Sequence, residues 1–109
     1  MSDRSSGGDF QFRVSDSLAV PLRGYLLRLK LLEGRPSMSV LAPGRRILLV
    51  SPGGERREVT IRAHGATGGR ASQKRLDEYS ELDVIISTDD AGQGRGQVAI
   101  GWIARGPVS

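Results

Sequence analysis

The stretch that decides the fold is residues 23–32, RGYLLRLKLL, in which apolar and basic side chains alternate. In an extended chain, the odd positions from Tyr25 to Leu31 fall on one face, while Arg28 and Lys30 fall on the other. A helix is the competing interpretation, because leucine is a good helix former. The period of two decides for a β-strand with one buried face.

Similar patterns on both sides of this stretch predict five more strands. FQFRV at residues 10–14 alternates strictly, and RILLV at residues 46–50 is apolar on both faces, as a central strand would be. Near the C-terminus, Val98, Ile100 and Trp102 share one face, so we expect all three in the core. The expected strands are residues 10–14, 23–32, 46–50, 59–63, 82–87 and 97–104.

Glycine and proline mark the connections between these strands. SPGGE at residues 51–55 predicts a hairpin, because proline presets φ and the glycines allow positive φ. Residues 65–80 are expected to form a long loop with one helical turn near residues 73–79. Asp89 and Asp90 are expected to initiate a turn.

Six short strands at this spacing are typical of an all-β sandwich or barrel. Because closure removes exposed sheet edges, we expect a small closed six-stranded antiparallel barrel. The length of 109 residues allows one domain, expected at residues 10–107. Residues 1–9 are polar and glycine-rich, so they are expected to form a flexible tail.

Composition narrows the classes of function. The chain has no cysteine, which excludes a disulfide framework, a thiolate nucleophile and a cysteine metal site, and which favours a cytoplasmic location. No apolar run approaches the roughly 20 residues that span a bilayer, so no membrane partner is expected. The net charge of +4 comes from 16 basic and 12 acidic residues, and all the basic residues except Lys30 and Lys74 are arginine.

The sequence offers little for catalysis. His64 is the single histidine, and it follows an expected strand beside a glycine, which is more typical of a turn residue than of a catalytic base. With no cysteine and one histidine, no metal site or cofactor is expected. One motif suggests a ligand-binding role: the glycine-rich turn from Gly65 to Gly69, which reads HGATGG together with the preceding histidine. Such a turn binds a pyrophosphate when a helix follows it.

The arginines provide the candidate binding residues. Arginine suits phosphate recognition, although an arginine-rich surface can also follow from genome composition and carry no function. The candidates for nucleic-acid binding flank one expected hairpin and could converge. They are Arg45, Arg46, Arg56, Arg57 and Arg62.

Several short motifs resemble, in order and spacing, the second domain of elongation factor Tu and related translational GTPases. They are FRVSD at residues 12–16, RGY at residues 23–25, APGRRI at residues 42–47, and VAIGW at residues 98–102. The resemblance implies a six-stranded barrel, and in that family this domain helps to hold the aminoacyl end of transfer RNA or contacts ribosomal RNA. These 109 residues leave no room for a GTPase domain, so nucleotide hydrolysis is not expected of them, and no individual contact residue can be carried over.

The leading hypothesis is therefore a non-catalytic, stand-alone barrel of translation-factor type that binds RNA or an RNA-associated protein. The first alternative is a protein–protein or self-association module, in which Leu26 and Leu32 on the less apolar face of the residue 23–32 strand contact the partner. The second alternative is a small nucleotide-binding domain that uses the turn from Gly65 to Gly69.

Overall fold

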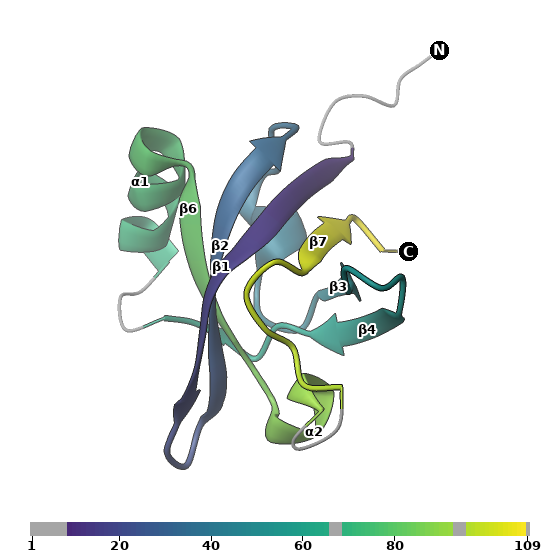
Figure 1. Cartoon of the computed structure of the whole chain (residues 1–109). Coiled ribbons are helices and arrows are strands. Elements are labelled where there is room, and N and C mark those ends of the chain that lie inside the picture. Colours follow the sequence, from purple (N-terminus) through teal and green to yellow (C-terminus); the bar gives the residue numbers. More distant parts are fainter. Residues whose placement is uncertain (1–8, 66–68, 93–95, 109) are drawn as a thin grey trace.

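The computed structural model of the chain describes residues 9–65, 69–92 and 96–108. Its elements in chain order are β1 (Phe10–Val20), β2 (Gly24–Glu33), the 3-10 helix η1 (Met38–Leu41), β3 (Arg46–Val50), β4 (Arg56–Thr60), β5 (Ala63–His64), α1 (Gly69–Tyr79), β6 (Glu81–Ile86), α2 (Thr88–Ala91) and β7 (Ile103–Gly106). One sheet contains all seven strands, in the order β4-β3-β7-β1-β2-β6-β5, and every neighbouring pair is antiparallel (Figure 1).

The long β1–β2 hairpin forms the middle of the sheet. As the alternation in residues 23–32 predicts, Leu27 and Leu29 are fully buried, while Lys30 is exposed. β1 continues to Val20, well beyond the expected end at Val14. A register shift between Val14 and Asp16 moves later residues to the opposite face, so the alternation visible at residues 10–14 is lost although the strand continues.

The tip of this hairpin is a β-turn with an unfavourable residue in it. The Arg23 amide donates to the Val20 carbonyl at 2.9 Å, which places Pro21 and Leu22 at the two central positions. Leu22 has φ +67°, a left-handed conformation that glycine or asparagine usually supplies at this position. Its side chain is fully exposed, so no burial in the chain offsets a backbone cost of about 1–2 kcal/mol.

The closed six-stranded barrel expected from the sequence is wrong: the sheet has seven strands and is not closed. Its two edge strands, β4 and β5, are joined by only Ile61 and Arg62. The Ile61 amide bonds to the Arg45 carbonyl beside β3, and the Arg62 amide bonds to the Ile85 carbonyl of β6, at 2.8 and 2.7 Å. The two edges therefore meet only at Ile61 and Arg62, a link that we call the crossing. No ladder of hydrogen bonds joins β4 to β5 among the described residues.

Helix α2 contacts β4 and β2 and so lies beside the opening between the two edges. The Asp90 side chain accepts a hydrogen bond from the Thr60 amide at 3.1 Å, which satisfies an outward-facing donor of the edge strand. The Ser87 side chain caps the helix by accepting from the Asp90 amide. The pair Asp89–Asp90, expected to start a turn, is thus part of a capped one-turn helix.

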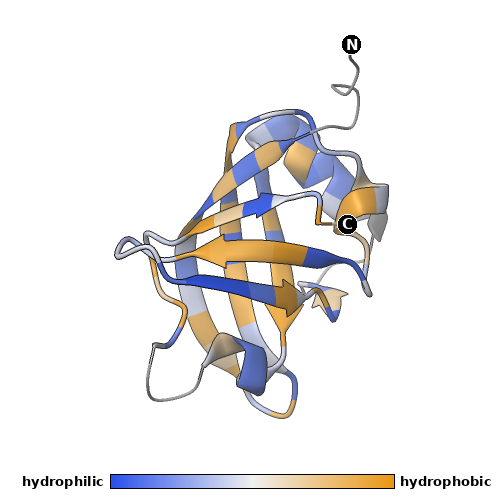
Figure 2. Ribbon diagram, turned by 90° about the vertical axis from the view of Figure 1, so that its right-hand side faces the viewer, coloured by the Kyte–Doolittle hydropathy of each residue, from blue (hydrophilic) through white to orange (hydrophobic). Residues whose placement is uncertain are grey.

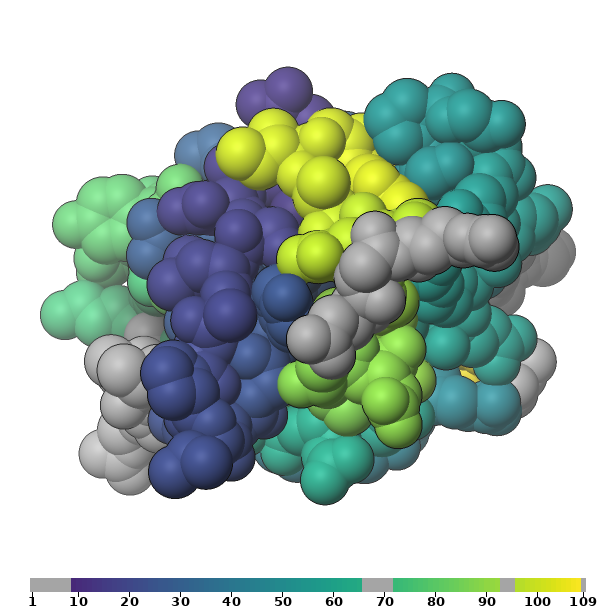
Figure 3. Space-filling view, turned by 60° about the horizontal axis from the view of Figure 1, so that its bottom comes forward, coloured from purple at the N-terminus to yellow at the C-terminus, as the bar shows by residue number. Residues whose placement is uncertain are grey.

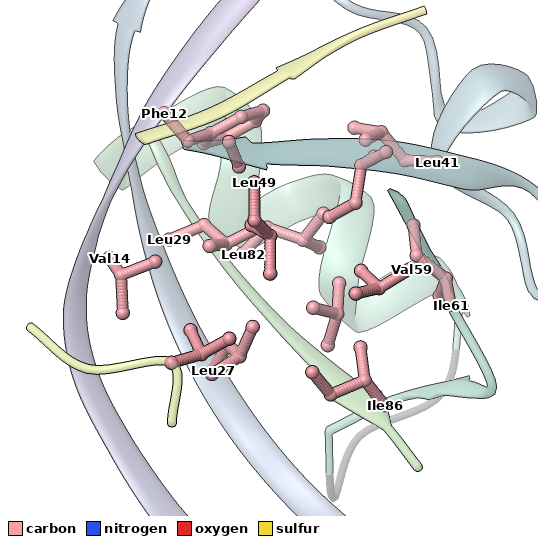
Figure 4. Close-up of a cluster of buried hydrophobic side chains, with 14 of the residues drawn as sticks. Phe12, Val14, Leu27, Leu29, Leu41, Leu49, Val59, Ile61, Leu82 and Ile86 are labelled. Carbon is pink, nitrogen blue, oxygen red and sulfur yellow. The ribbon is translucent and has the colours of Figure 1, made fainter. Parts of the chain in front are cut away.

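A single hydrophobic core fills the space enclosed by the curled sheet (Figure 4). Side chains from β1, β2 and β6 face those from β3 and β4 across this space. The completely buried members include Phe12 on β1, Leu49 on β3 and Leu82 on β6. Trp102 is 5% exposed and belongs to the core, as expected.

Three segments differ from the sequence-based expectation. Residues 65–80 contain an eleven-residue helix, α1, rather than a long loop with one turn. The single strand expected at residues 59–63 is divided between β4 and β5 by the crossing. The last strand covers only Ile103–Gly106, and Ile100, expected in the core, is 61% exposed, because residues 97–102 have no regular strand conformation.

We predict that Leu22→Gly stabilises the protein by about 0.5–1 kcal/mol, because glycine adopts positive φ without strain but is more flexible when unfolded. Chemical denaturation measures this change. The matched control is Leu32→Gly, another exposed leucine, in β2 and without positive φ, which is expected to destabilise the protein by a similar amount. Equal destabilisation by both substitutions would show that the turn is not strained.

Gly24 follows the same turn and packs against the backbone of β6. It has φ +122°, and a Cβ at this position would overlap the Ile86 carbonyl oxygen. We expect Gly24→Ala to destabilise the protein by about 2 kcal/mol or more, because both the φ value and the close approach resist a side chain. Gly54→Ala, also at positive φ but with open space around its Cβ, isolates the φ contribution in the same thermal-unfolding measurement.

Candidate nucleic-acid interface

The candidate site is the outer face of β1, β7, β3 and β4. In Figure 2 the apolar strand β3 faces the viewer, with β4 and β7 on either side of it. Strand pairing aligns side chains across this face in two rows. The first row is Arg13, Ile103, Val50 and Arg56. The second row is Gln11, Arg105, Leu48 and Glu58. Three half-buried apolar side chains, those of Leu48, Val50 and Ile103, therefore lie at the centre of the face, with arginines around them.

Arg13, Arg56 and Arg105 are exposed on three different strands. Within the described residues, none of the three side chains forms an ion pair or a hydrogen bond. Arg56 and Arg105 both line a shallow hollow of about 390 Å³. Arg13 and Arg56 are three strand positions apart, which corresponds to about 14 Å between their backbones. We call these three residues the outer arginine triad.

The charge of this face is positive despite its acidic residues. Glu58 lies in the second row, but its carboxylate is paired with Arg46 at 2.8 Å. Glu33 and Asp9 line the same hollow as Arg56 and Arg105 without forming an ion pair with either. The face thus presents, around its apolar centre, three guanidinium groups without a partner carboxylate in the described chain, an arrangement that suits an anionic ligand.

The structure separates the five arginines that the sequence singles out. Arg46 and Arg56 lie on the outer face of the β3–β4 hairpin but at its opposite ends, because Arg46 pairs with Thr60 and Arg56 pairs with Val50. Arg45 is exposed in the turn before β3. Arg57 and Arg62 lie elsewhere, so the five residues do not form one cluster.

Arg57 holds the fold together from inside the sheet. It shares the inward face of β4 with Val59, and its guanidinium lies 5.3 Å from the Trp102 ring centroid. It donates to the carbonyl oxygens of Gly96 at 2.8 Å and Asp90 at 3.3 Å, and it pairs with Glu55. One side chain therefore joins β4, α2 and the segment before β7.

Arg62 lies at the crossing between β4 and β5, away from the triad's hollow. It is exposed and lines a second hollow, of about 410 Å³, beside the tip of the β1–β2 hairpin. Arg23 of the hairpin lines the same hollow, and among the described residues no acidic side chain does. The two hollows have no lining residue in common.

On the β2–β6 side of the sheet, two arginines are paired with acidic residues. Asp83 accepts from Arg28 at 3.0 Å and from Arg75 of α1 at 2.8 Å, and Glu81 accepts from Arg75 at 3.1 Å. The hydrogen bond to Asp83, followed by its charge, raises the pKa of the Arg28 guanidinium above its ordinary value. These contacts attach α1 to β6 and give both arginines partner carboxylates.

The other sequence candidates have structural surroundings of their own. The His64 Nε2 donates to the Leu41 carbonyl at 2.9 Å, so the imidazole connects β5 to η1. Among the described residues, no group of acidic and histidine side chains has the geometry to hold a metal ion. The turn from Gly65 to Gly69 does precede a helix, although residues 66–68 lie outside the described chain. β5 and β6 on either side of that helix are antiparallel, whereas a dinucleotide-binding unit needs parallel strands.

Arg13 and Arg105 are not among the five arginines that the sequence singles out. Arg13 lies between Phe12 and Val14 in a strictly alternating strand, so its outward orientation is readable from the sequence. Arg105 follows the same rule on β7. The information that is absent from the sequence is the strand order, which places β7 between β1 and β3.

Neither a protein-family model nor a curated protein matches this sequence. Within the described ranges, no helix combines the length and the apolar character needed to cross a bilayer.

Arg56 and Arg57 are a matched pair for separating surface charge from structure. We expect Arg57→Ala to destabilise the protein by about 1–3 kcal/mol, because it removes two carbonyl contacts, an ion pair and the contact with Trp102. Arg56→Ala should change stability by less than about 0.5 kcal/mol. Urea denaturation followed by tryptophan fluorescence measures both, and equal effects would contradict the assigned orientations.

Proposed function

We propose that this chain is a non-catalytic binding module that holds the phosphate backbone of RNA on the outer face of β1, β7, β3 and β4. The observation that carries the proposal is the outer arginine triad: Arg13, Arg56 and Arg105 lie around one hollowed face without partner carboxylates in the described chain. Ion pairs with carboxylates engage Arg28, Arg46 and Arg75, whereas the triad forms none within the described residues.

The geometry favours backbone contacts over base recognition. Arginine presents several N–H donors in a planar fork that suits phosphate oxygens. The exposed or half-buried side chains around the triad are aliphatic or polar, and the aromatic Trp102 is buried, so the described part of this face has no stacking platform for bases. Binding of this kind positions a nucleic acid without reading its sequence, and its affinity falls with salt.

The proposed mechanism involves no reaction. The imidazole of His64 is engaged with a backbone carbonyl, and it lies on β5 rather than beside the triad. The resemblance to the second domain of translational GTPases also predicts RNA as the partner, and it stays a prediction. The proposal rests on the arginine triad and not on that resemblance.

We predict that a double charge reversal, Arg56→Glu with Arg105→Glu, weakens binding to a mixed pool of small RNAs by at least roughly tenfold at low salt. The dependence of log affinity on log salt concentration should also become shallower, by about 0.7–0.9 for each phosphate that the variant no longer neutralises. Filter binding or fluorescence anisotropy across a salt series measures both quantities.

The control variant is Lys74→Glu, which changes charge by the same amount per site on the exposed surface of α1, away from the triad. It should leave most of the affinity and the salt dependence intact. RNA binding that responds equally to both variants would indicate general charge attraction rather than this face. Binding that is absent at low salt would refute the proposal outright.

A further inference from the structure

The tip of the β1–β2 hairpin forms a second candidate site, independent of the arginine triad. In Figure 3 the hairpin, in dark blue, forms one corner of the molecule and reaches beyond the green α2. Leu22 is at the tip, fully exposed and at positive φ. The hollow beside it is lined by residues 19–25, Arg62, Ser87 and Thr88.

Two properties of this tip conflict with a purely structural role. A type II turn is formed best with glycine or asparagine at the position of Leu22, and an exposed leucine gains nothing from the rest of the chain. Local rules that a sequence breaks without compensation tend to be found at functional sites. A protruding apolar side chain can also serve as the anchor of a protein interface when the partner supplies a pocket for it.

The charges at the tip define the chemistry of its partner. Arg23 comes from the hairpin and Arg62 from the crossing between the sheet edges, both are exposed, and neither side chain is paired within the described residues. Among the described residues no carboxylate lines the hollow, and Asp90 of the neighbouring helix is engaged with the Thr60 amide. RNA offers anionic phosphates but no apolar socket for a leucine. A second copy of this basic chain would bring positive charge to a positive site.

We propose that the hairpin tip binds an acidic peptide segment of a protein partner. The side chain of Leu22 inserts between apolar side chains of that segment, and Arg23 and Arg62 pair with its aspartate or glutamate residues. The apolar part of the hollow, with Pro21 and Tyr25, receives the remaining contact. This surface could operate while the outer face of β1, β7, β3 and β4 is occupied.

The test is selection of random linear peptides from a display library on the full chain, followed by affinity measurement with synthetic versions of the selected peptides. We expect the selected peptides to combine aspartate or glutamate with leucine, isoleucine or phenylalanine. Leu22→Gly should weaken their binding roughly 10- to 100-fold, while the protein itself remains at least as stable. Arg23→Gln and Arg62→Gln should each weaken binding by several fold or more, and Lys74→Gln should not.

Three outcomes would overturn the proposal. The first is failure to select any peptide, or selection of peptides without acidic residues. The second is binding that Leu22→Gly leaves unchanged, since that variant keeps the fold and removes only the anchor. The third is tighter binding of the wild type than of Leu22→Gly to phosphatidylserine vesicles with no peptide binding, which would assign the tip to a lipid surface.

Discussion

The crossing at Ile61 and Arg62 is the constraint on which the rest of the structure depends. Two consecutive amide groups bond to the two opposite ends of the strand order, one to Arg45 beside β3 and the other to Ile85 of β6. The Ile61 side chain is fully buried, so this short link is also fixed by the core. The two edges of the curled sheet are therefore joined only at this link. Other elements cover the opening between the edges.

Polar side chains beside the opening form hydrogen bonds that complete this part of the fold. Asp90 satisfies an edge amide of β4, and Arg57 joins the same region to the segment before β7 across the face of Trp102. Buried or edge backbone groups are costly to leave without partners, so side chains that complete them are part of the fold. Arg57, although it lies next to Arg56 in the sequence, belongs to this structural set.

The same alternation that fills the core creates the outer face. Phe12 and Val14 are buried, so Arg13 between them points outward. Likewise, Ala104 is buried, so the next residue, Arg105, points outward. Ion pairs engage Arg28 of β2 and Arg75 of α1, whereas the triad forms none within the described residues. The molecule thus has two basic sites of different character: an aliphatic face with three arginines, and a leucine-tipped hairpin with two.

Much of the fold and part of the site could be predicted from the sequence. The alternation of residues 23–32 and 10–14 predicts their strands, and the SPGGE turn predicts the β3–β4 hairpin, because these patterns depend on contacts between near neighbours. The inward orientation of Arg57 can also be predicted from the sequence, because the period of two that buries Val59 places Arg57 on the same face. The sequence pattern does not predict helix α1, because only a few of its residues are apolar and its ion pairs with β6 join Arg75 to Asp83 and Glu81.

By itself, the sequence determined a β-rich chain, its main turns and most residues of its core. Local side-chain periodicity and glycine or proline conformation are enough to specify these features. Only the tertiary structure decided that the sheet stays open and that β7 inserts between β1 and β3. It also decided which arginines share a face, because Arg13, Arg56 and Arg105 are far apart in the sequence and are brought to one face by long-range strand pairing, which no local pattern encodes.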